Sequence, residues 1–473
     1  MQRLLNAEWI TLHGLVAMLA VAIFAIGARA RGERRHPSAA MAWVISLALM
    51  PYVAIPIYLL VGNRKVVRGR ALPRPDAVRK PSAPADSPSA RFQQLAGAMG
   101  LPAAAPYVEL AVHADGAVAL LALRDVIRSA EHSLDVCTFL LGRDALGAEV
   151  ASLLADSARR GVRVRLLIDG VGRYLGGRPD LSGLKAAGVE VAVFVSPFRS
   201  ALPGRTNLRN HRKLVIADGQ RTWTGGRNLG GEYFTGQSPA GGAGTDQPWV
   251  DLTVDFAGAL ARQTQARFDA DWAFATDSGA PEDAASLPAE ASAPVGPRAQ
   301  LIASGPDQAD DTLYALLISS FFTARSRITA VTPYFVPDAQ LMLALTLAAR
   351  RGVGVDLVLP ARSNHRLADL ARHPALRDLA AAGARVWLVD DMVHAKAVLI
   401  DDDLALVGSA NLDERSLFLN YELMVAFFDR TDVGRIGDWV GTLRQRGTAY
   451  AAQPPGLSRQ FIEGIVRWLA FQL

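Results

Sequence analysis

The chain has 473 residues, half of them hydrophobic and a fifth charged, and it contains one cysteine, Cys137. This length favours two or three domains, and the composition excludes a wholly disordered or collagen-like protein. A single cysteine also excludes an internal disulfide framework and any zinc or iron–sulfur site built from cysteines. The stability of the fold must therefore come from packing.

The positive charge is concentrated near the N-terminus. The net charge of the chain is +5, and residues 29–80 alone hold eleven Arg or Lys against two acids. The rest of the chain is mildly acidic, whereas a nuclease or another nucleic-acid-binding protein needs a basic surface to neutralise phosphates. We therefore expect no nucleic acid partner.

Two apolar runs lie on either side of the basic segment 29–35. No Asp, Glu, Lys or Arg occurs in residues 9–28 or 37–62, and each run is long enough for a helix across a hydrocarbon core of about 30 Å. We expect residues 1–62 to be a membrane anchor with two apolar segments. A cleaved signal peptide is the alternative for the first run, although Glu8 spoils its basic n-region. Pro51 and Pro56 make a re-entrant hairpin the alternative for the second run.

Two stretches rich in Pro, Ala and Ser divide the remainder of the chain. Residues 63–90 combine a basic collar with a tether, and residues 276–297 form a second linker. The sequence thus predicts two domains of similar size, at residues 91–275 and 298–473.

The two domains repeat one pattern. Residues 157–164 (SARRGVRV) return as residues 348–355 (AARRGVGV), and residues 184–191 (LKAAGVEV) return as residues 379–386 (LAAAGARV). Each segment is typical of a helix end, a glycine stop and an apolar strand. Strands that alternate with helices indicate βαβ crossovers, so we expect two tandem α/β units, each with a largely parallel sheet covered by helices.

The strongest motif occurs once in each domain. Five identities recur at identical spacing, and they are His211, Lys213, Asp218, Gly225 and Asn228, matched by His394, Lys396, Asp401, Gly408 and Asn411. A lone histidine in an apolar strand is usually a core residue, but chance does not place two of only eight histidines in one five-residue pattern. Two of the five lysines also lie here, in a chain with 45 arginines, which favours a compact ammonium as a phosphate contact.

This spacing suggests a phosphoryl-transfer site. A histidine and a lysine two residues apart on a strand face the same side, and the asparagine in the following turn can present an amide donor there. A pseudo-twofold arrangement of the halves would hold a tetrahedral anion between two imidazoles. One imidazole can attack phosphorus while the other protonates the leaving alcohol, which gives a covalent phosphohistidine.

Both copies match an HxKxxxxD signature followed by G-[GS]-x-N, so the chain resembles the phospholipase D superfamily. The apolar N-terminal runs, residues 332–338 (TPYFVPD) and residues 420–422 (NYE) make it similar to the bacterial cardiolipin synthases. The resemblance implies phosphatidyl transfer between two phosphatidylglycerol molecules with release of glycerol, and it implies no metal and no cofactor. The catalytic residues that it implies are His211, Lys213, Asn228, His394, Lys396 and Asn411.

The acceptor stays open at the level of sequence. A phospholipase D that uses water would release phosphatidic acid, and phosphatidylethanolamine is a narrower alternative as donor. A non-catalytic phospholipid-binding protein would show no turnover. Oligomeric state cannot be read from the sequence.

Supporting residues can be located through the repeat. Residues 422–427 (ELMVAF) align with residues 251–256 (DLTVDF), which places Glu422 and Asp251 at the same point in each domain. A carboxylate behind each histidine would fix its tautomer, and an edge-strand acid that faces water is the alternative. Asp218 and Asp401 look structural in the family.

The two copies also differ. Ser409 replaces Gly226 of the first copy, which predicts a hydroxyl contact to phosphate from one half only. The first copy has an insertion at residues 199–210 with Arg199, Arg205 and Arg209, which is either a lipid entrance or an inert surface loop.

The last three expectations concern the C-terminal stretch, the location of the catalytic domains and the role of His211. Residues 457–473 have apolar residues at helical spacing, which is typical either of core packing or of an interfacial amphipathic helix. Basic residues 64–80 favour the cytoplasmic face of a bacterial inner membrane for the catalytic domains. Similarity to two-copy family members favours His211 as the nucleophile.

Overall fold

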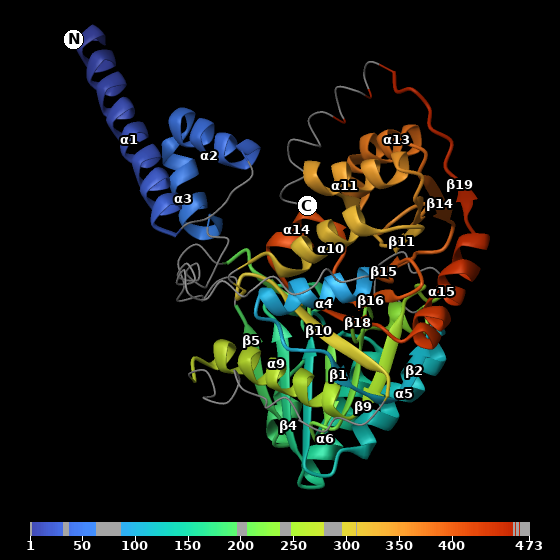
Figure 1. The fold of residues 1–473 in the computed structure, drawn as a ribbon. Helices are drawn as coiled ribbons and strands as arrows, with labels where there is room; N and C mark the ends of the chain where they lie inside the picture. The colour runs from blue at the N-terminus through green and yellow to red at the C-terminus, as the bar shows by residue number, and fades with distance from the viewer. Residues whose placement is uncertain are drawn as a thin grey trace, which may run out of the picture. The chain divides into compact units, whose positions relative to one another are not determined.

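The structure is a computed structural model. It describes residues 2–31, 37–62, 87–195, 206–236, 247–278, 296–308, 310–456, 459 and 463. The described residues form two compact units. One unit is built on the N-terminal helices, and the other contains both halves of the repeat (Figure 1).

The N-terminal unit contains three helices. They are α1 (Gln2–Arg31), α2 (Pro37–Leu49) and α3 (Pro51–Val61). Tyr58 of α3 lies at the centre of their packing, with ring contacts to Phe24 of α1 at 5.5 Å and to Trp43 of α2 at 5.1 Å.

The second apolar run is not one helix. It breaks at Met50, and Pro51 begins α3, where the missing N–H of proline leaves no hydrogen bond unmade. In the part of the chain that the structure describes, no helix has both the length and the apolar character of a membrane span. The expectation of two spanning segments is therefore not confirmed.

The first half of the repeat, residues 105–276, alternates strands and helices. Its strands are β1 (Ala105–Pro106), β2 (Val108–His113), β3 (Ser133–Thr138), β4 (Arg163–Asp169), β5 (Glu190–Phe194), β6 (Arg209–Asn210), β7 (Leu214–Ala217), β8 (Arg221–Gly225) and β9 (Thr253–Ala257). Its helices are α5 (Gly116–Ser129), α6 (Ala145–Arg159), α7 (Gly172–Leu175), α8 (Ser182–Ala186), the 3₁₀ turn η2 (Gly231–Tyr233) and α9 (Ala259–Thr276).

The second half follows the same plan. Its strands are β10 (Arg298–Ser304), β11 (Arg327–Val331), β12 (Phe335–Val336), β13 (Gly354–Pro360), β14 (Arg385–Val389), β15 (Ala397–Ile400), β16 (Leu404–Gly408), β17 (Leu412–Asp413), β18 (Asn420–Phe427) and β19 (Thr448–Ala449). Its helices are α10 (Thr312–Thr323), α11 (Ala339–Arg350), α12 (Arg366–Ala371), α13 (His373–Ala381), α14 (Glu414–Phe418) and α15 (Arg430–Gln445).

The repeat seen in the sequence is a repeat of topology. One sheet has the order β2-β9-β8-β7-β3-β4-β5, and the other contains the order β10-β18-β16-β15-β11-β13-β14. The predicted helix ends are confirmed, because α6 and α11 each stop before a glycine with positive φ, Gly161 at 92° and Gly352 at 89°. Glycine adopts this left-handed conformation without the clash that a Cβ atom would cause.

The expectation of largely parallel sheets is wrong. Only β3, β4 and β5, with their counterparts β11, β13 and β14, form the parallel part of each sheet. The neighbouring strands β7, β8 and β9 run antiparallel, as do β15, β16 and β18. Short turns at residues 218–220 and 401–403 cause this, because a turn without a crossover helix returns the chain antiparallel.

Each half has its own hydrophobic core. The first core includes Leu123, Leu154 and Val164, and the second includes Leu316 and Leu357. One helix crosses the expected domain boundary: α4 (Pro88–Ala98) precedes the first half in the chain, but its buried residues Phe92 and Ala96 pack into the second core. A first domain that starts at residue 91 therefore assigns this helix to the wrong half.

Candidate active site

The two histidine–lysine pairs lie at the start of equivalent strands. His211 and Lys213 come immediately before β7, and His394 and Lys396 immediately before β15, so the motif precedes the strand rather than lying within it. Each ammonium donates to the main-chain carbonyl of the histidine two residues earlier, at 2.6 Å for Lys213. The side chain of His211 is 14% exposed and that of His394 only 5%.

Each histidine is held by an acid from the opposite half of the chain. Nδ1 of His211 lies 3.1 Å from the carboxylate of Glu422 in β18. Nδ1 of His394 lies 2.7 Å from Asp251, which precedes β9. Both carboxylates are fully buried, so the alternative of edge-strand acids facing water does not hold.

Main-chain contacts between the halves explain this exchange. The N–H of His211 donates to the carbonyl of Tyr421, and the N–H of His394 donates to the carbonyl of Val250. In both cases the acid is the next residue along the chain. The same hydrogen bond that joins the halves therefore brings a carboxylate beside the imidazole of the other half.

The two asparagines follow the next strand of each half. Asn228 and Asn411 lie in the turns after β8 and β16, and both are buried. Nδ2 of Asn228 donates to the hydroxyl of Tyr233 at 2.8 Å. Among the described residues, the buried amide oxygens of both asparagines have no hydrogen-bond partner. Each side chain therefore retains capacity for one more polar group.

Burial and mutual repulsion set the charges of this cluster. Burial is the largest cause that lowers the pKa of His394, to about 3, and the ammonium of Lys396, 2.9 Å from the ring nitrogens, lowers it further. Burial likewise lowers the pKa of Lys213 to about 7 and that of Lys396 to about 8. Against burial, which raises it, His394 and Lys396 hold the pKa of Asp251 at about 2.

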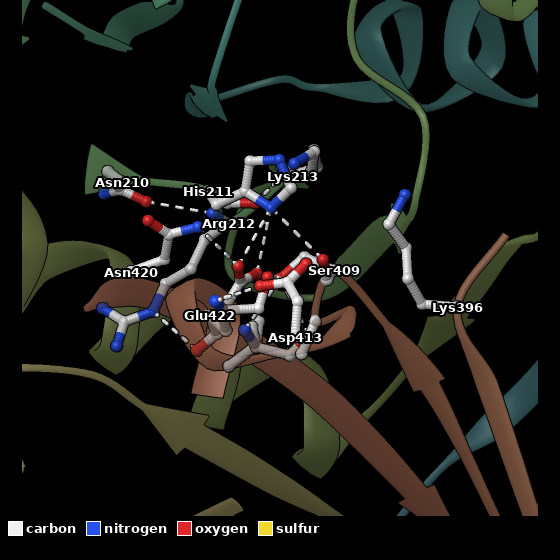
Figure 2. A network of polar contacts seen from close by, with 12 residues as sticks. Asn210, His211, Arg212, Lys213, Lys396, Ser409, Asp413, Asn420 and Glu422 are labelled. Atoms are coloured by element: carbon white, nitrogen blue, oxygen red, sulfur yellow. Dashed lines mark hydrogen bonds and ion pairs between the residues drawn. The ribbon is translucent and has the colours of Figure 1, made fainter. Parts of the chain in front are cut away.

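The two sets of residues share one site. The charge of Lys396 lowers the pKa of His211 in the first half, and the charge of Lys213 lowers the pKa of His394 in the second. Such mutual effects require short separations within a poorly solvated region. Figure 2 shows Glu422 below the His211 ring, between Asn420 and Ser409, with Lys396 to one side, at the start of β15.

Comparison with known proteins identifies the family of the chain. Residues 123–272 and 317–442, more than half of the chain, match the family described as cardiolipin synthase, PLD-like domain. The chain belongs to the cardiolipin synthase family of phospholipase D-like proteins. The two matched segments contain both histidine–lysine motifs and both acids.

Individual relatives in this family match most of the chain. Cardiolipin synthase 1 of Bacillus cereus is 30% identical over 91% of this chain and 88% of its own length. Cardiolipin synthase A of Pseudomonas aeruginosa is 32% identical over 85% of this chain and 83% of its own. Among solved structures, the phosphatidylserine synthase of Haemophilus influenzae shares the fold with a TM-score of 0.62 at 14% identity, over 81% of this chain and all of that one.

The predicted hydroxyl contact from Ser409 to phosphate stays a prediction, and the structure shows what the hydroxyl contacts within the protein. The hydroxyl donates to the carboxylate of Glu422 at 2.5 Å and accepts from the N–H of Leu423 at 3.0 Å. The equivalent position in the first half is Gly226. A serine does not fit at this position, because its Cβ atom would lie 2.1 Å from the carboxylate of Asp251. The difference between Ser409 and Gly226 therefore also affects how the two acids are held.

Asp218 and Asp401 support turns away from the imidazoles. Both have positive φ, 53° and 50°, in the turns after β7 and β15. The carboxylate of Asp218 accepts from the N–H groups of residues 131–133, and that of Asp401 accepts from the N–H groups of residues 325–327. These contacts fix the start of β3 and β11.

The insertion of the first copy is only partly described. Arg199 and Arg205 lie outside the described residues, so a lipid entrance there stays a prediction. Arg209 does not fit an entrance, because it is buried and pairs with the buried Asp169 at 3.3 Å. In the C-terminal stretch the two described residues are helical, and Glu463 pairs with Arg377 of α13 at 2.5 Å, which is packing against the second half.

Sequence reasoning missed the aromatic residues around the two rings. Phe139 contacts His211 edge to face with ring centres 5.3 Å apart. Tyr233 and Trp249 contact His394 at 5.0 and 5.5 Å. The only sequence signal for Tyr233 and Trp249 is their position between Asn228 and Asp251. Throughout the described part of the chain, no three His, Cys, Asp or Glu side chains are grouped to hold a metal ion.

Proposed function

We propose that this protein is a membrane-associated cardiolipin synthase. It transfers a phosphatidyl group from one phosphatidylglycerol to a hydroxyl of a second and releases glycerol. The observation that carries this proposal is the meeting of two His–Lys–Asn sets at one site, each imidazole backed by a carboxylate from the other half. The names of relatives that match most of the chain support the same reaction.

The reaction proceeds in two displacements. In the first, Nε2 of His211 attacks phosphorus, the bond from phosphorus to the headgroup oxygen breaks, and protonated His394 gives its proton to the departing glycerol. In the second, neutral His394 takes the proton of the acceptor hydroxyl, whose oxygen attacks phosphorus and breaks the phosphorus–nitrogen bond. Glu422 binds Nδ1 of His211 and so keeps Nε2 as the attacking atom.

Substrate binding itself prepares His394 to act as the acid. In the free protein, the ammonium of Lys396 lies beside the ring and opposes its protonation. A bound phosphodiester anion would attract this ammonium, and its negative charge would favour the imidazolium. Lys213, Asn228 and Asn411 supply the remaining polar contacts to the phosphate.

The lipid substrates imply that the site works at a bilayer. We propose that the N-terminal apolar segments hold the protein there, with the catalytic halves on the cytoplasmic face of the inner membrane. Eleven basic residues in segment 29–80 would favour anionic lipids, at about 1 kcal/mol for each residue near the surface.

Lipid analysis of the purified full chain tests the proposed function. Detergent-solubilised protein is incubated with phosphatidylglycerol labelled in its acyl chains, and products are separated by thin-layer chromatography. We expect labelled cardiolipin and an equal amount of free glycerol, with His211→Asn and His394→Asn as inactive controls. Phosphatidic acid without cardiolipin would show a hydrolase instead, and unchanged lipid would support a non-catalytic binding protein.

A further inference from the structure

Two buried arginines distinguish the first copy of the motif from the second. Arg212 and Arg227 are both fully buried, whereas the second copy has Ala395 and Ala410 at these positions. Removing a guanidinium from water is costly unless its donors are satisfied. The hydrogen bonds of the two side chains show which parts of the site the buried arginines hold in place.

Arg212 binds the main chain of the acid that holds His211. Its Nε donates to the carbonyl of Glu422 at 3.0 Å, as Figure 2 shows, and Nη2 donates to the carbonyl of Ser304 at 3.0 Å. Nη1 pairs with the carboxylate of Asp271 at 2.5 Å. The arginine therefore fixes β18 of the second half from the first half, beside the histidine that Glu422 supports.

Arg227 does the same for the acid that holds His394. Nη2 donates to the carbonyl of Asp251 at 2.9 Å, and Nη1 donates to the hydroxyl of Thr253 at 2.8 Å. Nε donates to the carbonyl of Tyr233 at 3.2 Å, and the Tyr233 hydroxyl in turn holds Asn228. Carbonyls of residues 113–114 accept the remaining hydrogen bonds. One side chain thus fixes both Asp251 and the support of Asn228.

We propose that Arg212 and Arg227 are positioning residues for phosphatidyl transfer, each fixing the main chain of the acid that orients one histidine. This rests on the proposed function only for the identity of the transferred group. A carboxylate can hold an imidazole in one tautomer and one direction only if its own main chain does not shift. The first copy therefore supplies this rigidity for both histidines.

The two arginines differ in charge balance. Arg212 forms an ion pair with Asp271. Within the described residues, Arg227 makes no hydrogen bond to a carboxylate, and its charge helps to lower the pKa of Asp251. Loss of Arg227 should therefore raise the pKa of Asp251 and free its main chain. Loss of Arg212 should free the main chain of Glu422 without changing the pKa of Asp251.

The experiment compares Arg227→Met, Arg227→Lys and Arg212→Met in the full chain. Turnover of phosphatidylglycerol is followed by the glycerol released, as kcat and KM across pH. We expect both methionine variants to lose about 10²-fold in kcat, since small displacements of catalytic groups have this effect, with little change in KM. Arg227→Lys keeps the charge and can keep part of the hydrogen bonding, so it should recover part of the kcat that Arg227→Met loses.

Arg165→Met is the matched control. Arg165 is a buried arginine of the same half, in an ion pair with Asp135, and it contacts neither acid of the site. Its loss should lower the melting temperature but leave the kcat and pH profile of the folded protein unchanged. Folded Arg227→Met with the wild-type kcat, or equal kcat losses in Arg165→Met, would overturn the proposal.

A second readout does not depend on turnover. Labelling the histidine rings with carbon-13 allows His394 to be titrated by NMR, with its signal assigned by His394→Asn. Asp251 favours the protonated imidazole, so a displaced Asp251 should shift this titration in Arg227→Met and not in Arg165→Met. If the wild-type protein turns over no lipid, this measurement still decides the positioning role, and an unchanged titration would refute it.

Discussion

His211 and His394 have the same ring atoms but different surroundings. His211 is the more exposed ring, and the hydroxyl of Ser409 and the amide of Asn420 both bind the carboxylate that holds it. His394 is almost enclosed, between aromatic rings and an ammonium that opposes its protonation. The more accessible ring suits attack on phosphorus, and the enclosed ring suits proton transfer away from bulk water.

This difference predicts which single variant still forms the covalent intermediate. The test uses an artificial substrate, the phosphatidyl ester of p-nitrophenol. Its leaving group, nitrophenolate, needs no proton from His394. We expect His394→Asn to release about one equivalent of nitrophenolate in a burst and then to stall, because no base activates the acceptor. His211→Asn should release none. A burst from His211→Asn alone would assign the nucleophile to His394.

At the scale of elements, the turns after β7 and β15 depend on one aspartate each. Replacing Asp401 with alanine removes the acceptor of three main-chain N–H groups and places alanine at positive φ. We expect a loss of about 3 kcal/mol in unfolding free energy, with a smaller loss for Asp401→Asn, which tolerates this conformation and keeps one oxygen.

The control for Asp401 is its neighbour. Asp402 is 82% exposed and pairs with Arg327 at the surface, so Asp402→Ala should change stability very little. Denaturant unfolding in detergent measures stability, and glycerol release well below the melting temperature measures kcat. A stable but inactive Asp401→Ala protein would contradict the structural role.

The sequence predicts the elements of this site better than their partners. The histidine, lysine and asparagine of each half could be predicted, because they lie close together in the chain and their spacing occurs twice. The exchange of Glu422 and Asp251 between the halves was not predictable, since equal spacing fits pairing within a half as well as between halves. Antiparallel pairing was missed because apolar strands look alike in either direction. The sequence does show that alanines replace Arg212 and Arg227 at the equivalent positions of the second copy. Only the structure shows what the two arginines bind.

At the scale of the whole molecule, the two halves together build the candidate site. Each imidazole depends on a carboxylate from the other half, and the hydrogen bonds that place the carboxylates also join the halves. Even α4, which precedes the first half, packs into the core of the second. Neither half of the chain therefore contains a complete site.

The last prediction concerns the side of the membrane on which this site works. Segment 64–80 follows the second apolar run and carries seven Arg or Lys against one acid, and positively charged segments are retained in the cytoplasm. Two spanning segments, or none, leave the catalytic halves on the same side as the N-terminus.

An alkaline phosphatase fused after Leu473 requires export for activity, so we expect this fusion to be inactive in cells. A fluorescent protein fused at the same residue should fold and be visible, and it serves as the control for expression. Phosphatase activity at normal expression would place the catalytic halves outside the cytoplasm and would leave the chemistry of the site unchanged.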